Sequence, residues 1–474
     1  MKKILLFVLA GLVVLVGVLI ARTARLTTRQ IEVEPVTGIE VDEGVVAEHL
    51  AGALRFRTIS HQDSTQFDGG AFRDFHAYLE ETYPGVHRVC GREVVADYSN
   101  LFRCSGVDPS LSAVLLMAHI DVVPVQPGTE ADWTYPPYAG EIADGYVWGR
   151  GAMDDKGLLI AILEAAELLI EGGGWPQRTV YLAFGHNEEI GGTGAAAIAE
   201  LLASRGVELE LVLDEGGVVT DVVPGVDRSV AVVGIAEKGF LSVELTVHTE
   251  GGHSSMPPPQ TAVGILSAAI RELEAHPVPG GIRGATAAMF DFLGPEMSFG
   301  QRLFVANRWL FGPLIERQFG ASREGAAMLR TTTAATIFQA GVKYTVLPAS
   351  ARAVVNFRVM PGDSKDSVVE HVRRTVDDSR VEVKLLGDFT EPSPVSDVES
   401  DAFARLQRTI GQVFPHAIVA PYLAVVGTDS RYYVELSRNV YRFGPLEVGS
   451  EDLRRIHGTD ERVSVAGLAD MVRF

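Results

Sequence analysis

Four short motifs place imidazole or carboxylate side chains directly after apolar segments of the chain. They are HID with His119 and Asp121, WGRGAMDDKG with Asp154 and Asp155, GHNEEIGG with Glu188 and Glu189, and LVLDEGG with Asp214. Carboxylates combined with a few imidazoles suit zinc, with manganese or cobalt as possible substitutes. A fifth candidate ligand is His457 in IHGTDER, far along the chain.

Each motif alone has an ordinary structural explanation. Histidine and aspartate commonly finish strands, acidic residues commonly cap helices, and a glutamate pair can form a solvated turn. The adjacent Glu188 and Glu189 would repel each other, however, unless a cation or a proton compensated them. His119 and Asp121 are two residues apart, so in a strand both lie on one side and the carboxylate can orient the imidazole. The combination favours a metal site over four unrelated turns.

The segments that precede these motifs predict an α/β domain. Apolar runs at 112–118, 179–184 and 209–213 are typical of buried strands, and 157–171 has the apolar spacing of a helix. This alternation indicates a mostly parallel sheet flanked by helices. Ligands of such sheets bind at the carboxyl ends of the strands, where the four motifs stand.

From about residue 238 the pattern changes to a small α+β unit. Alternating strands are expected at 240–248, 333–339 and 351–359, helices at 261–274 and 364–376, and a last strand at 381–386. This order predicts a ferredoxin-like domain inserted into the first one. The aromatic-rich segment 289–319 is interpreted either as a packed helical excursion or as an apolar patch that contacts a membrane or an acyl chain.

The expected domain division follows from these patterns. It assigns residues 1–25 to a membrane anchor or signal, 43–236 to the first part of the catalytic domain, 237–387 to an inserted lid and dimerisation domain with a hydrophobic excursion at 276–330, and 388–474 to the second part of the catalytic domain. A chain of 474 residues exceeds what one hydrophobic core normally supports, which agrees with two folded units.

The N-terminal segment has the composition of a membrane span. Residues 4–21 are apolar and uncharged, preceded by Lys2 and Lys3 and followed by Arg22 and Arg25. The run is long enough to cross a bilayer, and large residues surround any plausible cleavage point. We therefore expect an uncleaved single-pass anchor with the catalytic domain outside the cytoplasm. Secretion after signal cleavage is the alternative.

Charge and cysteine content exclude several classes of protein. With 61 acidic and 41 basic side chains the net charge is -20, which argues against nucleic acid or an anionic lipid surface as the main partner. Cys90 and Cys104 are too few for a disulfide-built scaffold or a thiolate cluster. One bridge between them is possible, and the sequence leaves their redox state open.

Taken together, the ordered motifs from about residue 45 to the C-terminus resemble a family of zinc-dependent exopeptidases and amidohydrolases. That family includes glutamate carboxypeptidase, succinyl-diaminopimelate desuccinylase, aminoacylase and carboxypeptidase S. The segments GGHSSMPP at 251–258 and TTTAATIFQAG at 331–341 look most like the branch that holds carboxypeptidase S and the N-fatty-acyl-amino-acid amidohydrolases. The resemblance implies two zinc ions per subunit and a short peptide or N-acyl amino acid as substrate.

The resemblance also implies a role for each ligand candidate. Asp154 would bridge two zinc ions, one also held by His119 and Asp214, the other by Glu189 and His457. These five side chains form the expected metal set.

Three further residues take catalytic roles in the same way. Asp121 would support His119, Glu188 would be the general base, and His253 of the lid would stabilise the oxyanion. Relatives often dimerise through the inserted domain, and some place its histidine in the partner's active site, so a homodimer is possible.

Substrate-binding residues are implied with an open alternative. Arg358, Gly427, Thr428 and Arg431 match positions that hold the substrate carboxylate, although the two arginines could equally form surface salt bridges. Thr345 stands where many relatives have an asparagine that reaches the substrate, which puts inherited contacts in doubt.

Three functions follow from the resemblance. The first is a carboxypeptidase that hydrolyses a peptide bond next to a free C-terminal carboxylate. The second is an amidohydrolase or reversible synthase of N-fatty-acyl amino acids, and the third, most remote, is an inactive binding ectodomain.

Overall fold

The computed structural model describes residues 1–223 and 225–474. Its largest sheet has nine strands. Eight of them follow one another in the order β1-β2-β6-β3-β7-β17-β9-β16, and the ninth, β8, pairs with β9. These strands are β1 (Gly91–Val95), β2 (Ser99–Cys104), β3 (Ala113–His119), β6 (Val180–Gly185), β7 (Leu209–Asp214), β8 (Val219–Thr220), β9 (Val230–Glu237), β16 (Ile418–Ala424) and β17 (Val440–Arg442). The centre β6-β3-β7-β17 is parallel, as expected, and antiparallel pairs on both sides make the sheet mixed. The predicted α/β class is confirmed.

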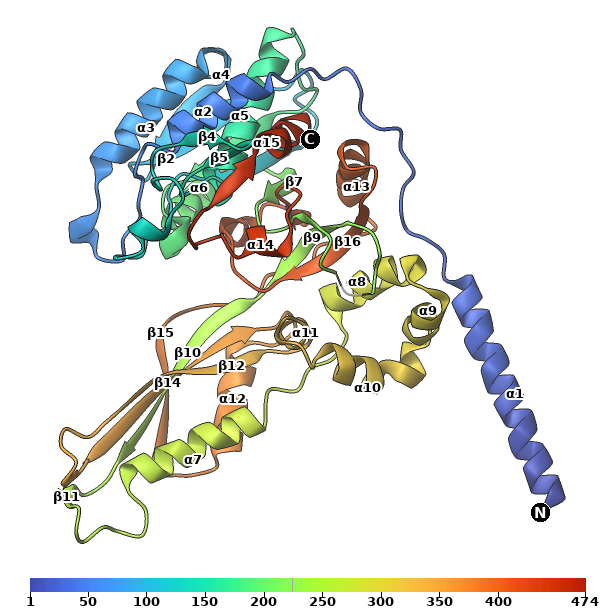
Figure 1. Ribbon diagram of the computed structural model, residues 1–474, viewed down its shortest axis with the longest axis vertical. Coiled ribbons are helices and arrows are strands. Elements are labelled where there is room, and N and C mark those ends of the chain that lie inside the picture. Colours follow the sequence, from blue (N-terminus) through green and yellow to red (C-terminus); the bar gives the residue numbers. More distant parts are fainter. Residues whose placement is uncertain (224) are drawn as a thin grey trace.

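Helices cover both faces of this sheet (Figure 1). They are α2 (Glu43–Ala53), α3 (Gly69–Thr82), α4 (Pro84–Val89), α5 (Lys156–Glu171), α6 (Thr193–Ser204), α13 (Asp401–Val413), α14 (Ser450–Leu453) and α15 (Val465–Arg473). A small sheet, β18-β5-β4, joins β4 (Glu141–Ala143), β5 (Tyr146–Trp148) and β18 (Arg462–Ser464). The apolar spacing that predicted α5 buries Leu159, Ile160 and Leu163 against α2 and α15.

A second, four-stranded antiparallel sheet projects away from the first (Figure 1). Its order is β12-β14-β10-β15, formed by β12 (Thr332–Ala340), β14 (Ser350–Val359), β10 (Gly239–His248) and β15 (Val381–Thr390). Helices α7 (Ala262–Ala275) and α12 (Lys365–Val376) pack on it, and a two-stranded pair, β11 (Gly252–His253) with β13 (Val346–Leu347), forms its far tip. We call this unit the lid. Its element order is the one the sequence predicted, and the domain boundaries themselves stay a prediction.

The hydrophobic excursion expected at 276–330, which contains the aromatic-rich segment, folds as four helices, α8 (Gly284–Leu293), α9 (Phe299–Ala306), α10 (Arg308–Phe319) and α11 (Arg323–Leu329). Helix α8 packs on β16, so its Phe290 and Phe292 enter the core of the large sheet. The helical excursion is therefore observed, and part of it is buried. Five one-turn 3-10 helices complete the elements: η1 (Ser64–Gln66), η2 (Glu130–Asp132), η3 (Glu188–Ile190), η4 (Gly294–Glu296) and η5 (Asp429–Tyr433).

The N-terminal helix α1 (Lys2–Arg25) extends away from the rest of the chain (Figure 1). It is the one helix of the described residues that is long and apolar enough to cross a membrane, by length and composition. Only its last turns are packed: Leu19 and Thr23 are buried, and the side chain of Asn307 donates to the Leu19 carbonyl oxygen over 3.2 Å. The contact holds α1 against α9.

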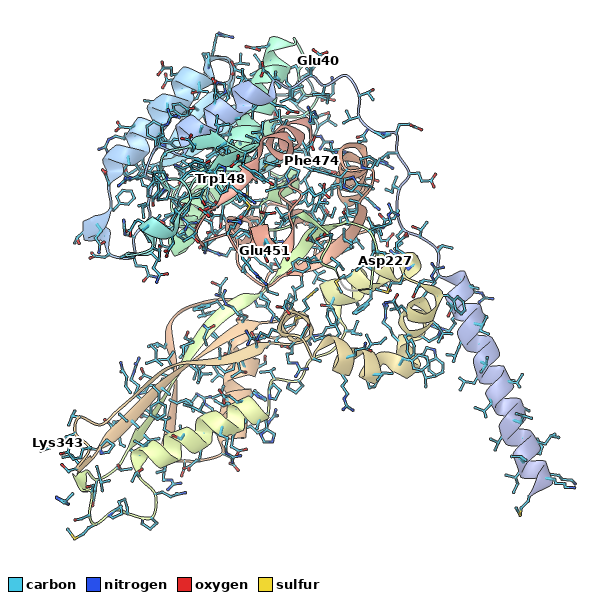
Figure 2. All side chains as sticks on the ribbon, viewed as in Figure 1. Glu40, Trp148, Asp227, Lys343, Glu451 and Phe474 are labelled. Atoms are coloured by element: carbon cyan, nitrogen blue, oxygen red, sulfur yellow. A yellow bond between two sulfur atoms is a disulfide. The ribbon has the colours of Figure 1, made fainter. Side chains whose placement is uncertain are left out.

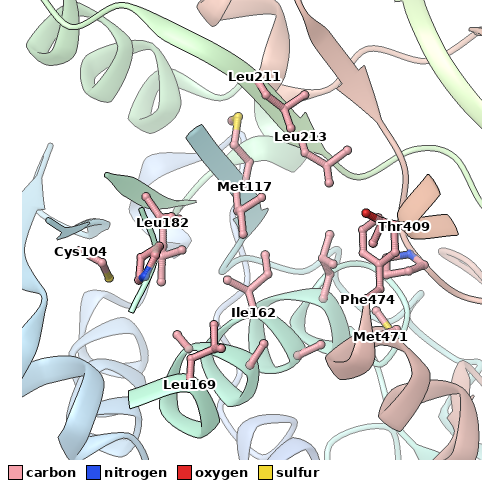
Figure 3. Close-up of a pocket in the computed structure, with 18 of the residues that line it drawn as sticks. Cys104, Met117, Ile162, Leu169, Leu182, Leu211, Leu213, Thr409, Met471 and Phe474 are labelled. Atoms are coloured by element: carbon pink, nitrogen blue, oxygen red, sulfur yellow. The ribbon is translucent and has the colours of Figure 1, made fainter. Parts of the chain in front are cut away.

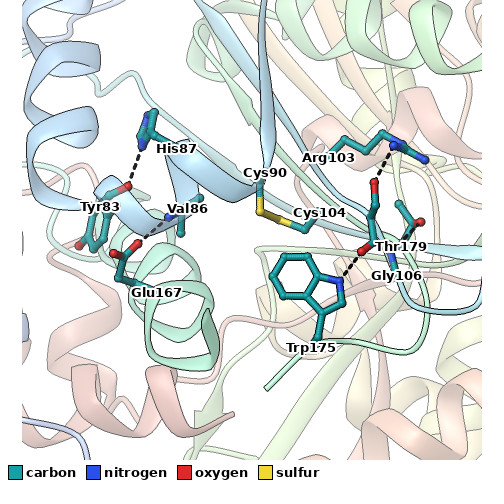
Figure 4. Close-up of a disulfide and its surroundings, with 11 residues drawn as sticks. Tyr83, Val86, His87, Cys90, Arg103, Cys104, Gly106, Glu167, Trp175 and Thr179 are labelled. Carbon is teal, nitrogen blue, oxygen red and sulfur yellow. Dashed lines mark hydrogen bonds between the residues drawn. A yellow bond between two sulfur atoms is a disulfide. The ribbon is translucent and has the colours of Figure 1, made fainter. Parts of the chain in front are cut away.

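Cys90 and Cys104 form a disulfide, which settles the question that the sequence left open. The bridge joins the residue after α4 to the end of β2 (Figure 4). Beside it, the indole N–H of Trp175 donates to the carbonyl oxygen of Ser105.

Candidate metal centre

The candidate ligands meet at the carboxyl edge of three adjacent parallel strands. His119 ends β3, Asp214 ends β7, and η3 with Glu188 and Glu189 follows β6. Because β6, β3 and β7 are neighbours and run in the same direction, their ends lie side by side. Asp154 reaches the same edge from the loop before α5.

The Asp154 carboxylate lies between two imidazoles. Its Oδ1 is 2.9 Å from Nε2 of His119, and its Oδ2 is 2.9 Å from Nε2 of His457. The same nitrogen of His457 is 3.2 Å from Oε1 of Glu189. One carboxylate oxygen is thus directed to each histidine, as expected of a ligand shared between two metal ions. The proposed bridging position of Asp154 agrees with this geometry.

Asp214, the ligand expected at the end of β7, is held by backbone amides. The Asp214 carboxylate accepts hydrogen bonds from the backbone N–H of Glu215 over 3.0 Å and of Ser430 over 2.7 Å. The next side chain, Glu215, has its Oε1 3.7 Å from Nε2 of His119. One group of possible ligand atoms, all within 4.8 Å of one another, contains His119, Asp155 and Glu215, and another contains His119, Asp154 and Glu189. Glu215 and Asp155 therefore join the candidate metal ligands, whereas the Asp214 carboxylate is hydrogen-bonded to backbone amides.

Asp121 connects both halves of the centre. Its Oδ1 accepts from the N–H of Glu188 over 3.0 Å and lies 3.4 Å from Nδ1 of His119. Its Oδ2 accepts from the N–H of Glu189 over 3.2 Å and from the hydroxyl of Ser60 over 2.5 Å. The side chain is fully buried. Nδ1 of His119 is also 3.0 Å from the backbone carbonyl oxygen of Asp121, so Asp121 contacts His119 through its backbone and its carboxylate, and it positions the two glutamates.

Glu461 holds the loop that carries Asp154. This buried carboxylate accepts from the backbone N–H groups of Gly151, Met153 and Asp154 over 2.9 to 3.1 Å, and from the Arg150 guanidinium over 2.6 Å. Glu461 is not among the residues expected from the sequence, although it stands four residues after His457 in IHGTDER. Glu461 and its partners are separated by more than 300 residues in the sequence, so no local sequence pattern predicts these contacts.

The donor set fits divalent cations. Burial raises the pKa of Glu188 and of Glu215 well above the usual carboxyl range, and neighbouring carboxylates raise it further while His119 opposes them. Burial also disfavours the charge of Asp154, but the hydrogen bonds with His119 and His457 outweigh it and lower its pKa. Hydrogen bonds with Asp154 and Glu189 raise the pKa of His457 to about 10. Crowded acids of this kind are stabilised by positive charge at their centre.

Asp429 is a second buried acid that the sequence analysis missed. It is 3% exposed, and among the residues the structure describes neither of its oxygens has a hydrogen-bond partner. Burial, reinforced by the charge of Asp214, raises its pKa to about 8. A Cβ on Gly185 or Gly192 would collide with this carboxylate, which explains why glycine stands at the first and last positions of GHNEEIGG.

Three of the four substrate-binding candidates lie close to this edge or to the base of the lid. Arg431 donates to the carbonyl oxygen of Gly191 over 3.1 Å, directly after the glutamate pair. Thr428 is buried and donates to Glu237 over 3.1 Å. Gly427 leaves space for Arg431, whose Nη1 would be 2.9 Å from a Cβ there.

Arg358 lies on β14 at the end of the lid sheet next to the large sheet. Its guanidinium is 5.1 Å from the ring centre of Phe240, with which it is paired across β10 and β14. Burial lowers the pKa of Arg358 from the usual arginine range. The structure shows no direct contact of Arg358 with the metal ligands in the described residues.

The structure does not bring His253 to the centre within one chain. His253 lies in β11 and is exposed, with Nδ1 2.8 Å from the Ser255 hydroxyl. Its strand partner is Val346, three residues from Lys343, which marks the far tip of the lid in Figure 2. The expected role of His253 at the oxyanion stays a prediction, because one chain alone does not bring it to the centre.

Known proteins match this chain over most of its length. The model of the peptidase family M20/M25/M40 matches residues 115–474. The probable carboxypeptidase S-like 2 of Dictyostelium discoideum is 41% identical over 475 residues, which cover 97% of this chain and 91% of that protein. The N-fatty-acyl-amino acid synthase/hydrolase of Xenopus tropicalis is 42% identical over 477 residues, covering 98% and 92%.

Solved structures share the fold. The M20 family metallo-carboxypeptidase Sso-CP2 of Sulfolobus solfataricus has a TM-score of 0.64 at 20% identity, covering 92% of this chain and 97% of that one. A dinuclear metal binding peptidase of the M20 family from Bacillus subtilis has a TM-score of 0.56 at 14% identity, covering 91% and 96%. The resemblance drawn from the motifs is confirmed, including its branch. The chain belongs to the peptidase family M20/M25/M40 and is a hydrolase of the metallopeptidase type.

Proposed function

We propose that the chain uses two zinc ions to hydrolyse a peptide bond next to a free C-terminal carboxylate. The observation that carries the proposal is the Asp154 carboxylate between His119 and His457, each 2.9 Å away. His119 and Asp154 would share one ion with Asp214 or Glu215, and Asp154, Glu189 and His457 would hold the other. Two-ion sites of this type hold their metal ions through carboxylates and imidazoles, and zinc is the first choice for such ligands.

When bound, the ions would polarise the amide carbonyl and lower the pKa of the attacking water. Glu188 is adjacent to Glu189 but belongs to neither group of possible ligand atoms. Its N–H is fixed by Asp121, so the carboxylate stands beside the site as the general base. It would take a proton from the water and return it to the amine that leaves.

Recognition of the substrate carboxylate is assigned to guanidinium groups. Arg431 is held beside η3 through the Gly191 carbonyl oxygen. Arg358 stands where the lid meets the large sheet, so movement of the lid would bring it toward a substrate. Either arginine offers the forked donor geometry that a carboxylate prefers.

The second candidate is hydrolysis or synthesis of N-fatty-acyl amino acids. The Xenopus relative carries that name, and the substrate again presents a carboxylate next to the amide. The observation that favours it here is the apolar surface of α9 and α10 beside α1. A lipid-like acyl chain would be concentrated at such a surface.

We propose that α1 anchors the chain in a membrane and that α10 lies at the bilayer surface. Helix α10 has no buried residue among those described, although Trp309, Leu310 and Leu314 are apolar and 40% to 57% exposed. Residues 294–330 carry five arginines and three glutamates and are therefore net positive, whereas the whole chain has a net charge of -20. Because the end of α1 is packed against α9, a bilayer around α1 would also meet α10. Exposed tryptophan and arginine are typical of the membrane interface.

We also propose a homodimer through the lid. Strand β12 is the edge of its sheet, and Ile337 and Phe338 on it are more than 40% exposed. A second copy could cover this edge. His253, far from the centre of its own chain, would then be available to the partner's site.

The test uses the full chain in lipid nanodiscs, loaded with zinc. Dipeptides with a free carboxylate, their C-terminal amides and N-oleoyl amino acids are compared as substrates. We expect turnover of the free acids and none of the amides. Glu188→Gln should keep two zinc ions by elemental analysis and lose hydrolysis by at least about a hundredfold. An unchanged rate in Glu188→Gln would refute the base, and one zinc at saturation would refute the two-ion centre.

A further inference from the structure

A cavity of about 330 Å³ lies against one face of the large sheet, and among the candidate metal ligands only Asp214 lines it. Strands β3, β6 and β7 form its floor, and α5, α13 and α15 form its walls. Figure 3 shows Ile162 and Leu169 of α5 on one side of the cavity and Leu182, Leu211 and Leu213 of the strands on the other. None of His119, Asp154, Glu189 and His457 lines it. The volume is in the range of small-molecule sites.

The cavity separates two parts of the hydrophobic core on the same face of the sheet. One part is built around α5 and α15 and the other around α13. Between them, Leu116 of β3 and Leu213 of β7 stay only partly buried, although both strands are in the middle of a nine-stranded sheet. Apolar side chains at the centre of a sheet are normally covered, because their contact with water is unfavourable. An apolar ligand would cover them.

The polar groups of the cavity are few and lie toward one end. Arg405 and Thr409, one turn apart on α13, line it together with Phe474, and Figure 3 shows Thr409 and Phe474 at the end opposite Cys104. In the part of the chain that the structure describes, the Arg405 guanidinium has no carboxylate partner. The one acid of the lining, Asp214, is engaged by the N–H groups of Glu215 and Ser430.

From this arrangement we propose that the cavity binds a long-chain fatty acid. The aliphatic chain lies between α5 and the strands, and the carboxylate pairs with Arg405 at the α13 end. A single unbranched chain fits a cavity bounded on opposite sides by one helix and one sheet face. An apolar cavity with a guanidinium group at one end selects an anionic, single-chain molecule. The site is separate from the metal centre, so occupancy does not depend on hydrolysis.

The experiment uses photoreactive oleic acid with the full chain in nanodiscs, followed by mass spectrometry of the labelled peptides. We expect label in α5 and α13, and competition by unlabelled oleic acid. The Glu188→Gln variant should be labelled equally, which separates this site from the proposed hydrolysis. Label confined to peptides of the metal centre, or absent from α5 and α13, would overturn the proposal.

Two variants test the chemistry of the site. Arg405→Gln should weaken competition by oleic acid about fivefold, the effect of an exposed ion pair, and leave competition by uncharged oleyl alcohol unchanged. Arg408→Gln is the matched control, because Arg408 is exposed on the same helix and does not line the cavity. Ala165→Phe, at a partly buried wall position, should reduce labelling by both probes. Melting curves of the variants verify the fold, and equal behaviour of Arg405→Gln and Arg408→Gln would refute the role of Arg405.

Discussion

The Asp121 carboxylate accepts hydrogen bonds from the backbone of the glutamate turn and from Ser60, and its replacement by asparagine should weaken metal binding. Oδ1 accepts the Glu188 N–H, and Oδ2 accepts the Glu189 N–H and the Ser60 hydroxyl. Both oxygens face donors, so the amide NH₂ of an asparagine would oppose a donor in either orientation. At least one hydrogen bond to a charged acceptor is lost, which costs about 1.5–3 kcal/mol.

That cost predicts the size of the effect on zinc affinity. Loss of a supporting carboxylate reduces metal affinity by about 10- to 100-fold, equivalent to about 1.4–2.7 kcal/mol, so the two estimates agree. Competition of zinc between a chelator and the metal-free chain measures it. Ser60→Ala is the graded control, because it removes one hydrogen bond and keeps the carboxylate, and its loss should stay within about tenfold. Asp121→Asn with an affinity within about twofold of the parent would refute the proposed support.

Three further substitutions test separate parts of the structure. Glu215→Gln should lower zinc affinity more than Asp214→Asn if Glu215 is the ligand. A larger loss of affinity in Asp214→Asn in the same titration would show that Asp214 is the ligand. Burial, reinforced by the Arg358 charge, lowers the pKa of Lys238 to about 8, so the folded chain carries an unfavourable buried charge below that pH. The free energy of unfolding of the unsubstituted chain should therefore rise from pH 8 to 10.5, and Lys238→Met melting curves should lack this rise. Trp309→Phe should remove most quenching of tryptophan fluorescence by brominated lipid, and unchanged quenching would place α10 away from the bilayer.

The regular elements could be predicted because their periodicity is local. The strand expected at 112–118 is β3 (Ala113–His119), and the helix expected at 157–171 is α5 (Lys156–Glu171). The parallel order of these strands then follows from the alternation of strands and helices, and with it the edge where His119 and the glutamates meet.

The remaining features depend on contacts between distant segments. Asp214 and Glu215 are consecutive, and periodicity stops where β7 ends, so no pattern decides which carboxylate faces His119. Asp429 and Glu461 reach the centre from segments more than 200 residues beyond the strands they support. The position of His253 depends on the length and direction of the lid, which only the folded chain defines.

The supporting acids explain how so acidic a centre can keep its shape. Asp121 accepts from the backbone of the glutamate turn, Glu461 from the backbone of the Asp154 loop, and Asp214 from the backbone at Ser430. Each of these buried charges is stabilised by N–H groups of a segment at the site. The charges therefore do two things at once, because the hydrogen bonds that stabilise them also fix the loops that present the metal ligands. The ligand positions are set by contacts within the chain, and the cations add the charge that the remaining carboxylates require.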